Sequence, residues 1–263
     1  MSTAILGKNP VTDSVAQLLV NPLLDGQQGQ TLTNFTIYLE TLGIKGASHV
    51  EITNAVLANY VKPFHSLNQN IVYNYNGIYF ATPINTAPYY QNPADLITAI
   101  NTAINAVAPT VTFSLNPTTL RLNITEVGGN QFRMVGHFSG ETNLPNRCNL
   151  KLGFIGYEQP TASNSTVSAD IPLRIRPECI YVGTNLSFDA VQPSNFNLRN
   201  LLFRIPLTDT VGEIINFVPS TDQIFKLQLP VIESVTFSIY DDNFLNPNDL
   251  MEAPCQLEMH FAI

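Results

Sequence analysis

The chain has 263 residues, a net charge of −8 and an isoelectric point near 4.8, and only 12% of its residues are charged. Because 44% of the residues are apolar, the remainder is mostly neutral Asn, Gln, Ser and Thr, a composition that suits extensive contact with other protein. The 12 Lys and Arg residues form no basic run, which argues against binding to nucleic acid or to an anionic membrane surface.

Cysteine usage and the N-terminal sequence indicate the compartment. Cys148, Cys179 and Cys255 lie far apart and form no CxxC pair, so we expect three reduced, buried thiols, with neither a disulfide framework nor a zinc site. The N-terminus lacks the basic region and apolar core of a signal peptide. No run approaches the roughly 20 apolar residues of a membrane-spanning helix. We therefore expect a soluble product of a reducing compartment.

Residues 1–30 differ from the rest and are interpreted as an N-terminal arm. Val15, Leu18 and Leu19 have helical spacing, so a short helix is expected before Pro22, followed by a GQQGQ linker. Two interpretations remain open for this arm. It is either a disordered tail or a segment that docks on a neighbouring subunit and so buries its leucines.

From residue 31 onward the chain is mostly strands. LTNFTIYLE alternates apolar and polar residues, which is typical of a half-buried strand. NIVYNYNGIYF predicts a hairpin at Asn76-Gly77, and TVTFSLNPTTLRLNIT predicts a second hairpin across Asn116-Pro117. Further strands are expected in HVEITNAVLANYV, GNQFRMVGHF, ECIYVGTNLSF, NLLFRIPLT, EIINFVP, FKLQLP and VIESVTFSIYDD.

The last eight residues, QLEMHFAI, also alternate strictly. Leu257, Met259 and Phe261 point to one side and are predicted to be core residues of a final strand. Ile263 continues the series and is expected at the edge of the core or against a neighbouring molecule.

One segment, residues 92–109, predicts an amphipathic helix. Asn92 suits the N-cap, Pro93 suits the first helical position and Pro109 ends the pattern. The apolar stripe of this helix, expected to lie across one side of a sheet, consists of Leu96, Ile97, Ile100, Ile104 and Val107. A shorter helix is expected over residues 146–152.

These elements predict a mainly β protein, an antiparallel β-sandwich with long connections. The polar stretch 159–172 is interpreted as a long loop within one sandwich. The expected organisation is therefore an arm over residues 1–30 and a single β-sandwich domain over residues 31–263.

The sequence offers no catalytic, cofactor-binding or metal-binding motif, and we expect no enzyme activity. The loop YDDNFLNPNDL could present oxygen ligands to calcium, but Asp and Asn also favour turns, and we prefer the turn. The loop's candidate ligands are Asp241, Asp242, Asn243, Asn246, Asn248 and Asp249. The four histidines, His49, His65, His137 and His260, are widely spaced. Tyr89, Tyr90 and the loop 241–249 would be the contacts if the sandwich recognised a sugar or a receptor.

The order of the pieces resembles a known family over roughly residues 70–263. GIYF precedes the helix of YYQNPADL, then come VTFSLNPTTLRLNIT, LKLGF, ADIPLRIRPECIYVGTNL, NLLFRIPL, VIESVTFSIYDDN and the terminal CQLEMHF. This order is similar to that of the minor capsid, penton-type proteins of large double-stranded DNA viruses and virophages, within the adenovirus-like capsid lineage. The chain departs from the family at Asp241-Asp242-Asn243, where a Gly is common, and at its end, where many members carry a basic residue.

The resemblance implies a single jelly roll with one inserted amphipathic helix and an N-terminal arm. It also implies a virion protein made in the host cytoplasm, with five copies around each icosahedral vertex that contact the major capsid protein and other minor capsid proteins. No nucleic acid, membrane insertion or cofactor is implied. Two alternatives remain: a minor capsid or cement protein elsewhere in the shell, and a β-sandwich that binds a glycan or receptor.

Overall fold

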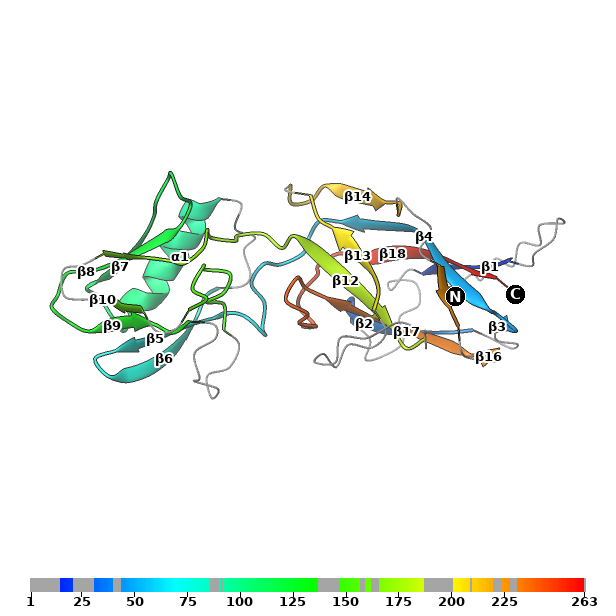
Figure 1. The fold of residues 1–263 in the computed structure, drawn as a ribbon, viewed down its shortest axis with the longest axis horizontal. Coiled ribbons are helices and arrows are strands. Elements are labelled where there is room, and N and C mark those ends of the chain that lie inside the picture. The colour runs from blue at the N-terminus through cyan, green and yellow to red at the C-terminus, as the bar shows by residue number, and fades with distance from the viewer. Residues whose placement is uncertain are drawn as a thin grey trace. The chain divides into compact units, whose positions relative to one another are not determined.

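The computed structural model describes residues 15–20, 31–39, 44–85, 90, 92–136, 147–156, 159–161, 166–186, 201–208, 210–219, 224–227 and 231–262. In these residues the protein is mainly antiparallel β with one α-helix, as predicted (Figure 1). The chain forms two compact units: unit 1 comprises Met1–Val61 and Pro177–Ile263, and unit 2 comprises Lys62–Arg176. The single domain expected over residues 31–263 therefore has a second compact unit inserted between its strands.

Unit 1 is built from two antiparallel sheets. The first has the order β1 (Val15–Val20), β18 (Cys255–Ala262), β4 (His49–Ala58) and β14 (Ile214–Phe217), and β15 (Ile224–Lys226) also pairs with β4. The second has the order β13 (Leu201–Pro206), β12 (Cys179–Thr184), β17 (Ser234–Tyr240) and β2 (Asn34–Tyr38). Two further short strands, β3 (Ile44–Lys45) and β16 (Val231–Ile232), pair with each other. Along the chain β3 follows β2, and β16 immediately precedes β17.

The strand order of unit 1 is that of a jelly roll. The strands are β1, β2, β4, β12, β13, β14, β17 and β18 in chain order, with β15 sharing the place of β14 along β4. In each sheet an early strand of the chain pairs with a late one, β1 with β18 and β2 with β17, which is the arrangement produced by two Greek keys. Unit 2 is inserted in the connection from β4 to β12.

The core of unit 1 confirms the predicted final strand. β18 lies between β1 and β4, and its side chains Leu257, Met259 and Phe261 are at most 1% exposed. In the other sheet, Phe35 of β2 and Phe237 of β17 are paired in register on the core side, and their rings stack with centroids 5.2 Å apart. Ile263 lies outside the described residues, so its predicted position stays a prediction.

The helix predicted around residues 15–19 is wrong. Val15–Val20 is strand β1, which pairs antiparallel with β18 from Val15↔Ala262 to Val20↔Leu257. The physical reason is that β18 presents a free ladder edge, and backbone hydrogen bonds to it outweigh a weak local helical pattern. The rest of the arm, residues 1–14 and 21–30, lies outside the described residues.

Unit 2 contains two sheets and helix α1 (Pro93–Asn105). One sheet has the order β10 (Gln159–Thr161), β9 (Phe132–Met134), β5 (Asn70–Tyr75) and β6 (Ile78–Pro83). The other has the order β11 (Thr166–Ser168), β8 (Leu122–Glu126) and β7 (Val111–Leu115). In the part of the chain that the structure describes, no helix has the length and hydrophobicity to cross a membrane.

Two local predictions in unit 2 are wrong. The stretch 159–172, expected as one loop, contains strands β10 and β11, which pair with β9 and β8. The helix expected over residues 146–152 is a turn instead. At this turn Gly153 has a φ of 93°, and a Cβ there would lie 2.3 Å from the Ile171 carbonyl oxygen, so the close approach requires glycine.

The two predicted hairpins and the helix of unit 2 are confirmed, the second hairpin by the antiparallel pairing of β7 with β8. Asn76 and Gly77 have φ values of 51° and 85°, the left-handed pair of a type I′ turn that joins β5 to β6. Asn92 caps α1 by accepting a hydrogen bond from the Asp95 amide at 3.0 Å. The apolar stripe of the helix is buried at Leu96, Ile100 and Ile104, whereas Ile97 is half-buried and Val107 lies beyond the last helical residue.

In unit 2, asparagine side chains form hydrogen bonds with backbone groups that would otherwise lack a partner strand. Asn149, which is fully buried, accepts a hydrogen bond from the Val72 amide at 2.9 Å and donates to the carbonyls of Val72 and Val135 at 2.7 and 2.6 Å. Asn101 of α1 exchanges two hydrogen bonds with the backbone of Phe113 on β7 (2.7 and 3.0 Å). α1 thereby covers part of an edge strand, and some of the neutral polar composition serves the fold.

Candidate functional site

The acidic loop after β17 is a hydrogen-bonded turn. Asp241 is fully buried, and its Oδ1 accepts hydrogen bonds from the amides of Asn243 and Leu245 at 2.9 and 2.8 Å. Asn243 in turn donates to the Asp242 carboxylate at 3.4 Å. Oδ1 of Asp241 therefore bonds to the backbone of its own loop. This is the arrangement expected if the loop is a turn and not a calcium site.

Asn246 attaches the same loop to the sheet. Its Nδ2 donates to the carbonyls of Ile239 and Thr33 at 2.6 and 3.0 Å, and its Oδ1 accepts from Asn34 Nδ2 at 3.2 Å. Among the described residues, no three His, Cys, Asp or Glu side chains gather closely enough to hold a metal ion. The loop oxygens are used to fix the corner between β17 and β18.

Sequence reasoning missed an aromatic pair at this corner. Phe244 has a φ of 60°, which is unusual for a bulky side chain, and it stacks on Tyr181 of β12 with ring centroids 4.5 Å apart. Both rings are half-buried. The left-handed conformation falls two residues after Asp242, inside the hydrogen-bonded turn.

Tyr90 is not available as a surface contact. The side chain is 4% exposed, its hydroxyl donates to the Asn85 carbonyl at 2.6 Å, and its ring meets Phe64 edge-on at 5.9 Å. The expectation that Tyr90 would touch a sugar or receptor is therefore wrong, because the aromatic ring fills the core of unit 2. Tyr89 lies outside the described residues.

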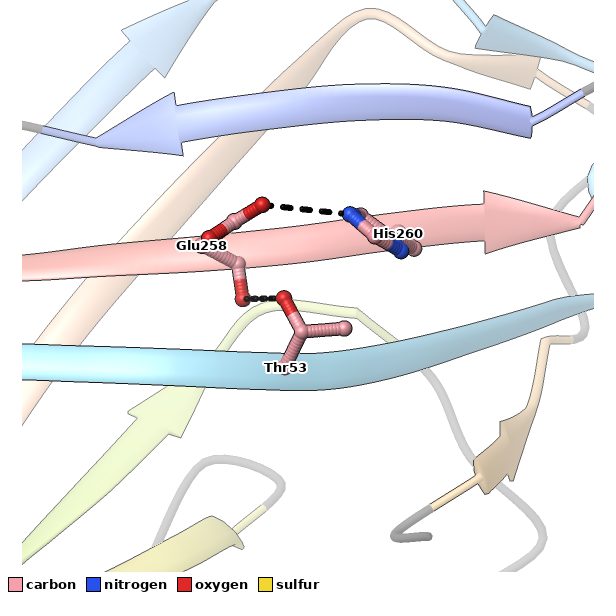
Figure 2. Close-up of polar contacts among 3 residues, drawn as sticks. All are labelled: Thr53, Glu258 and His260. Carbon is pink, nitrogen blue, oxygen red and sulfur yellow. Dashed lines mark hydrogen bonds and ion pairs between the residues drawn. The ribbon is translucent and has the colours of Figure 1, made fainter. Parts of the chain in front are cut away.

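The described histidines occupy separate places in the two units. His260 lies on the outer face of β18, where its Nε2 is 3.3 Å from Glu258 Oε1, and Thr53 of β4 donates to the Glu258 carbonyl at 3.4 Å (Figure 2). Glu51 lies opposite His260 in the register of β4 and β18. This face is thus charged. His49 lies near the start of β4, His65 is buried in unit 2, and His137 lies outside the described residues.

The outer face of the other sheet is uncharged at its centre. Thr36 of β2 and Thr236 of β17 share a hydrogen bond of 2.9 Å, and Ser238 donates to Asn34 Oδ1 at 2.9 Å. Hydroxyl and amide side chains therefore pair with each other across the strands, which leaves little charge to desolvate if other protein covers this face.

Glu126, at the end of β8, is a buried carboxylate with a full set of donors. Its Oε1 accepts from Thr110 Oγ1 at 2.6 Å and from the Gly128 amide at 2.8 Å, and its Oε2 accepts from the Asn130 amide at 3.1 Å. Asn130 Nδ2 adds a bond of 3.2 Å. Burial alone would raise the pKa of Glu126, but these hydrogen bonds outweigh it and hold the pKa below its usual value.

The three cysteines are free and buried, as predicted. Burial raises the pKa of the Cys255 thiol to about 12, and burial also raises the pKa of Cys148 well above its usual value. Protonated, enclosed thiols of this kind are core residues and poor nucleophiles.

Large apolar side chains are exposed at sheet edges of unit 1, which the strand patterns did not indicate. Ile214 on β14 is 71% exposed, and Val218, just after that strand, is 63% exposed. On the other sheet, Tyr38 at the end of β2 is 56% exposed. Surface-exposed apolar groups at strand edges are candidates for contact with other protein.

Comparisons with protein-family models and with curated proteins found no match to this chain. Among solved structures, the crystal structure of the selenomethionine-labelled mavirus penton protein is similar to it at 12% sequence identity and a TM-score of 0.49. The alignment covers 96% of this chain and 100% of the mavirus protein. The assignment of unit 1 to the jelly-roll class rests on its own strand order and register.

Proposed function

We propose that the chain is a structural capsid subunit of the penton type. The observation that carries the proposal is the jelly-roll strand order of unit 1, an architecture that recurs in viral capsid, lectin and cupin domains. The order of sequence pieces that resembles penton-type capsid proteins selects the first of these three.

The interior of unit 1 supports a packing role. Jelly rolls that bind a ligand inside the sandwich need polar groups there, whereas this core is filled by aliphatic and aromatic side chains. Val50, Ile52, Val182, Phe237 and Phe261 are at most 1% exposed and come from both sheets. Any binding by unit 1 must therefore use its outward surfaces.

In this role five copies surround an icosahedral vertex and contact the major capsid protein and other minor capsid proteins. The low charge of the chain favours such contacts, because few ionic groups lose water when the surfaces meet. A position elsewhere in the shell, as a minor capsid or cement protein, would use the same fold and differ only in its neighbours.

The test measures assembly and location separately. Native mass spectrometry of the purified chain is expected to show a homopentamer, and proteomics with cryo-electron microscopy of particles from the source virus is expected to place the chain at the vertices. Presence in particles away from the vertices would favour the cement role. A monomeric chain that is absent from particles would overturn the proposal.

The half-exposed Tyr181–Phe244 pair favours a second candidate, a sandwich that recognises a glycan or a receptor. Stacked aromatic rings at a loop are suited to the apolar face of a ligand, and the loop fixes Phe244 in a conformation that L residues rarely adopt. Binding on a glycan array that is lost in Phe244→Ala would support this candidate, and equal binding by both proteins would dismiss it.

A further inference from the structure

The turn between β5 and β6 contains the one Asn-Gly pair of the chain, Asn76-Gly77. Both residues are exposed, so water reaches them. In an Asn-Gly pair the glycine nitrogen can attack the carbon of the asparagine amide, because glycine has no side chain to hinder the approach. This reaction, deamidation, is one reason why asparagine is a thermolabile residue. The hydrogen bonds around the pair determine how readily it occurs in the folded chain.

The attacking nitrogen is engaged in the native turn. The Gly77 N–H donates to Asn74 Oδ1 at 3.0 Å, and Asn74 itself is only 8% exposed. The nitrogen has to lose its proton before it can attack, and a deprotonated nitrogen would face the lone pairs of this oxygen. Asn74 therefore opposes the first step of deamidation.

The amide under attack is engaged as well, by the loop after β8. Asn76 Oδ1 accepts a hydrogen bond from the Gln131 amide at 3.0 Å, and Asn76 Nδ2 donates to Asn130 Oδ1 at 3.2 Å. The backbone N–H of Asn76 donates to the Gln131 carbonyl at 2.9 Å. Closing a ring onto Gly77 makes the amide carbon tetrahedral and redirects it, so the reaction requires local opening of these contacts.

Glu126 determines which group position 76 must present to this loop. Asn130 Nδ2 donates to Glu126 Oε1 and to Thr110 Oγ1, both at 3.2 Å, so the Oδ1 of Asn130 is the atom directed at Asn76. That oxygen can only accept, whereas the Gln131 amide can only donate. An amide at position 76 satisfies both partners, and a carboxylate does not.

We propose that Asn76 is a deamidation site that the native hairpin protects, and that its conversion breaks the link between this hairpin and the loop after β8. A bond forms between Gly77 N and Asn76 Cγ, the Cγ–Nδ2 bond breaks, and ammonia leaves with the proton that Gly77 gives up. Water then opens the resulting succinimide to aspartate or isoaspartate. The proposal does not depend on the capsid function.

Both products lose the donor that the native link uses. Aspartate places an oxygen opposite Asn130 Oδ1 where the amide placed Nδ2. Isoaspartate in addition lengthens the main chain of a two-residue turn by one atom, which the left-handed pair at Asn76 and Gly77 does not accommodate. The reaction is therefore expected to release the hairpin permanently.

The first experiment measures the rate of deamidation. The full chain is incubated in mildly alkaline buffer, either native or unfolded in urea, and peptide mapping by mass spectrometry quantifies the Asn, Asp and isoAsp forms of position 76. The native chain is expected to react at least about tenfold more slowly than the unfolded chain, because several hydrogen bonds have to be lost together. Equal rates in the two samples overturn the protection.

The second experiment isolates Asn74. Asn74→Ala removes the acceptor of the Gly77 N–H and is expected to speed native deamidation by about two- to tenfold, the effect of one hydrogen bond. Asn74→Asp keeps an acceptor oxygen and is expected to react no faster than wild type. Unchanged deamidation in Asn74→Ala overturns the role of Asn74, and so does an equal acceleration in both variants.

The third experiment examines the product. Asn76→Asp imitates deamidated protein and keeps a residue that favours the same turn, so its effect reports the lost donor. We expect its melting temperature to fall by about 2–8 °C. Asn216→Asp, on an exposed side chain of β14, is the control and is expected to melt as wild type does. An Asn76→Asp protein that also melts as wild type does would overturn the proposed release of the hairpin.

Discussion

Glu126 shows how one buried charge can organise a loop. Its carboxylate receives hydrogen bonds from Thr110, Gly128 and Asn130, so it holds the turn after β8 against the start of β7. A Cβ at Gly128 would lie 2.4 Å from the Thr110 side chain, so the turn can approach this closely only with glycine. The turn at Gly128 and Gly129 is thus positioned by a carboxylate whose role the sequence did not reveal.

We expect Glu126→Gln to destabilise the protein by about 1–3 kcal/mol at neutral pH. Glutamine replaces one accepting oxygen by an NH2 group, which then faces a donor in either orientation of the amide. Urea denaturation of wild type and variant measures the difference. Glu213→Gln, on an exposed side chain, is the control and is expected to stay within about 0.5 kcal/mol of wild type.

The same pair of proteins gives a pH dependence. Because the pKa of Glu126 is lowered in the folded state, its stabilising contribution is fully present above the pKa of an unfolded glutamate, about 4.3, and is lost as the pH falls through the lower folded value. The difference between wild type and Glu126→Gln should therefore narrow in acid. A difference that stays constant from neutral pH to strongly acidic pH would show that the carboxylate charge is not what stabilises the loop.

Among the secondary-structure elements, those with a strong local pattern were predictable. Three examples are the Asn76-Gly77 hairpin, the Asn92 cap of α1 and the alternation of β18. Each depends only on residues close together in the sequence, so a local pattern is enough to predict it. β1 was not predictable, because its partner β18 is more than 200 residues away and supplies the hydrogen bonds that decide its conformation. β10 and β11 are only three residues long each, which is too short for any periodicity to show.

The candidate site was predicted less well than the fold. Tyr90 was a candidate contact only under the glycan or receptor alternative and it is buried, because an aromatic pair in the sequence does not indicate which way its rings point. The exposed Ile214 was not foreseen, because two adjacent isoleucines in EIINFVP do not show which of them faces the core. The turn around Asp241 was predicted correctly, since Asp and Asn have intrinsic turn preferences.

β18 is the element whose removal should be most damaging, because it pairs with β1 on one side and β4 on the other. Met259→Ala on its buried face is expected to cost about 2–5 kcal/mol, through lost burial and the cavity left behind. Gln256→Ala, on the exposed face of the same strand, should stay within about 0.5 kcal/mol of wild type. Chemical denaturation measures both.

Deletion of residues 257–263 tests the whole strand. It removes the ladder between β1 and β4 as well as three core side chains, so we expect the truncated chain to be insoluble or unfolded. A truncated protein that is soluble and melts cooperatively would show that β18 is an accessory strand.

At the scale of the whole molecule, the insertion of unit 2 could not be predicted from the sequence. The strands that form unit 1 are separated by Lys62–Arg176, and this inserted segment is itself rich in β structure, so no change of composition marks its borders. Each unit has its own core: Phe64, Tyr73, Leu96, Ile104 and Phe132 are buried in unit 2 and none of them contributes to the core of unit 1. Separate cores of this kind predict separate folding.

We therefore expect residues 62–176, expressed alone, to fold and melt cooperatively as a monomer.

Replacement of the same residues in the full chain by a flexible Gly/Ser linker of about ten residues should leave unit 1 folded, since β4 and β12 keep all of their ladder partners. Circular dichroism melting and two-dimensional NMR of both proteins measure folding. If 62–176 is unfolded alone while the full chain is folded, the two units depend on each other and the insertion is part of a single cooperative domain.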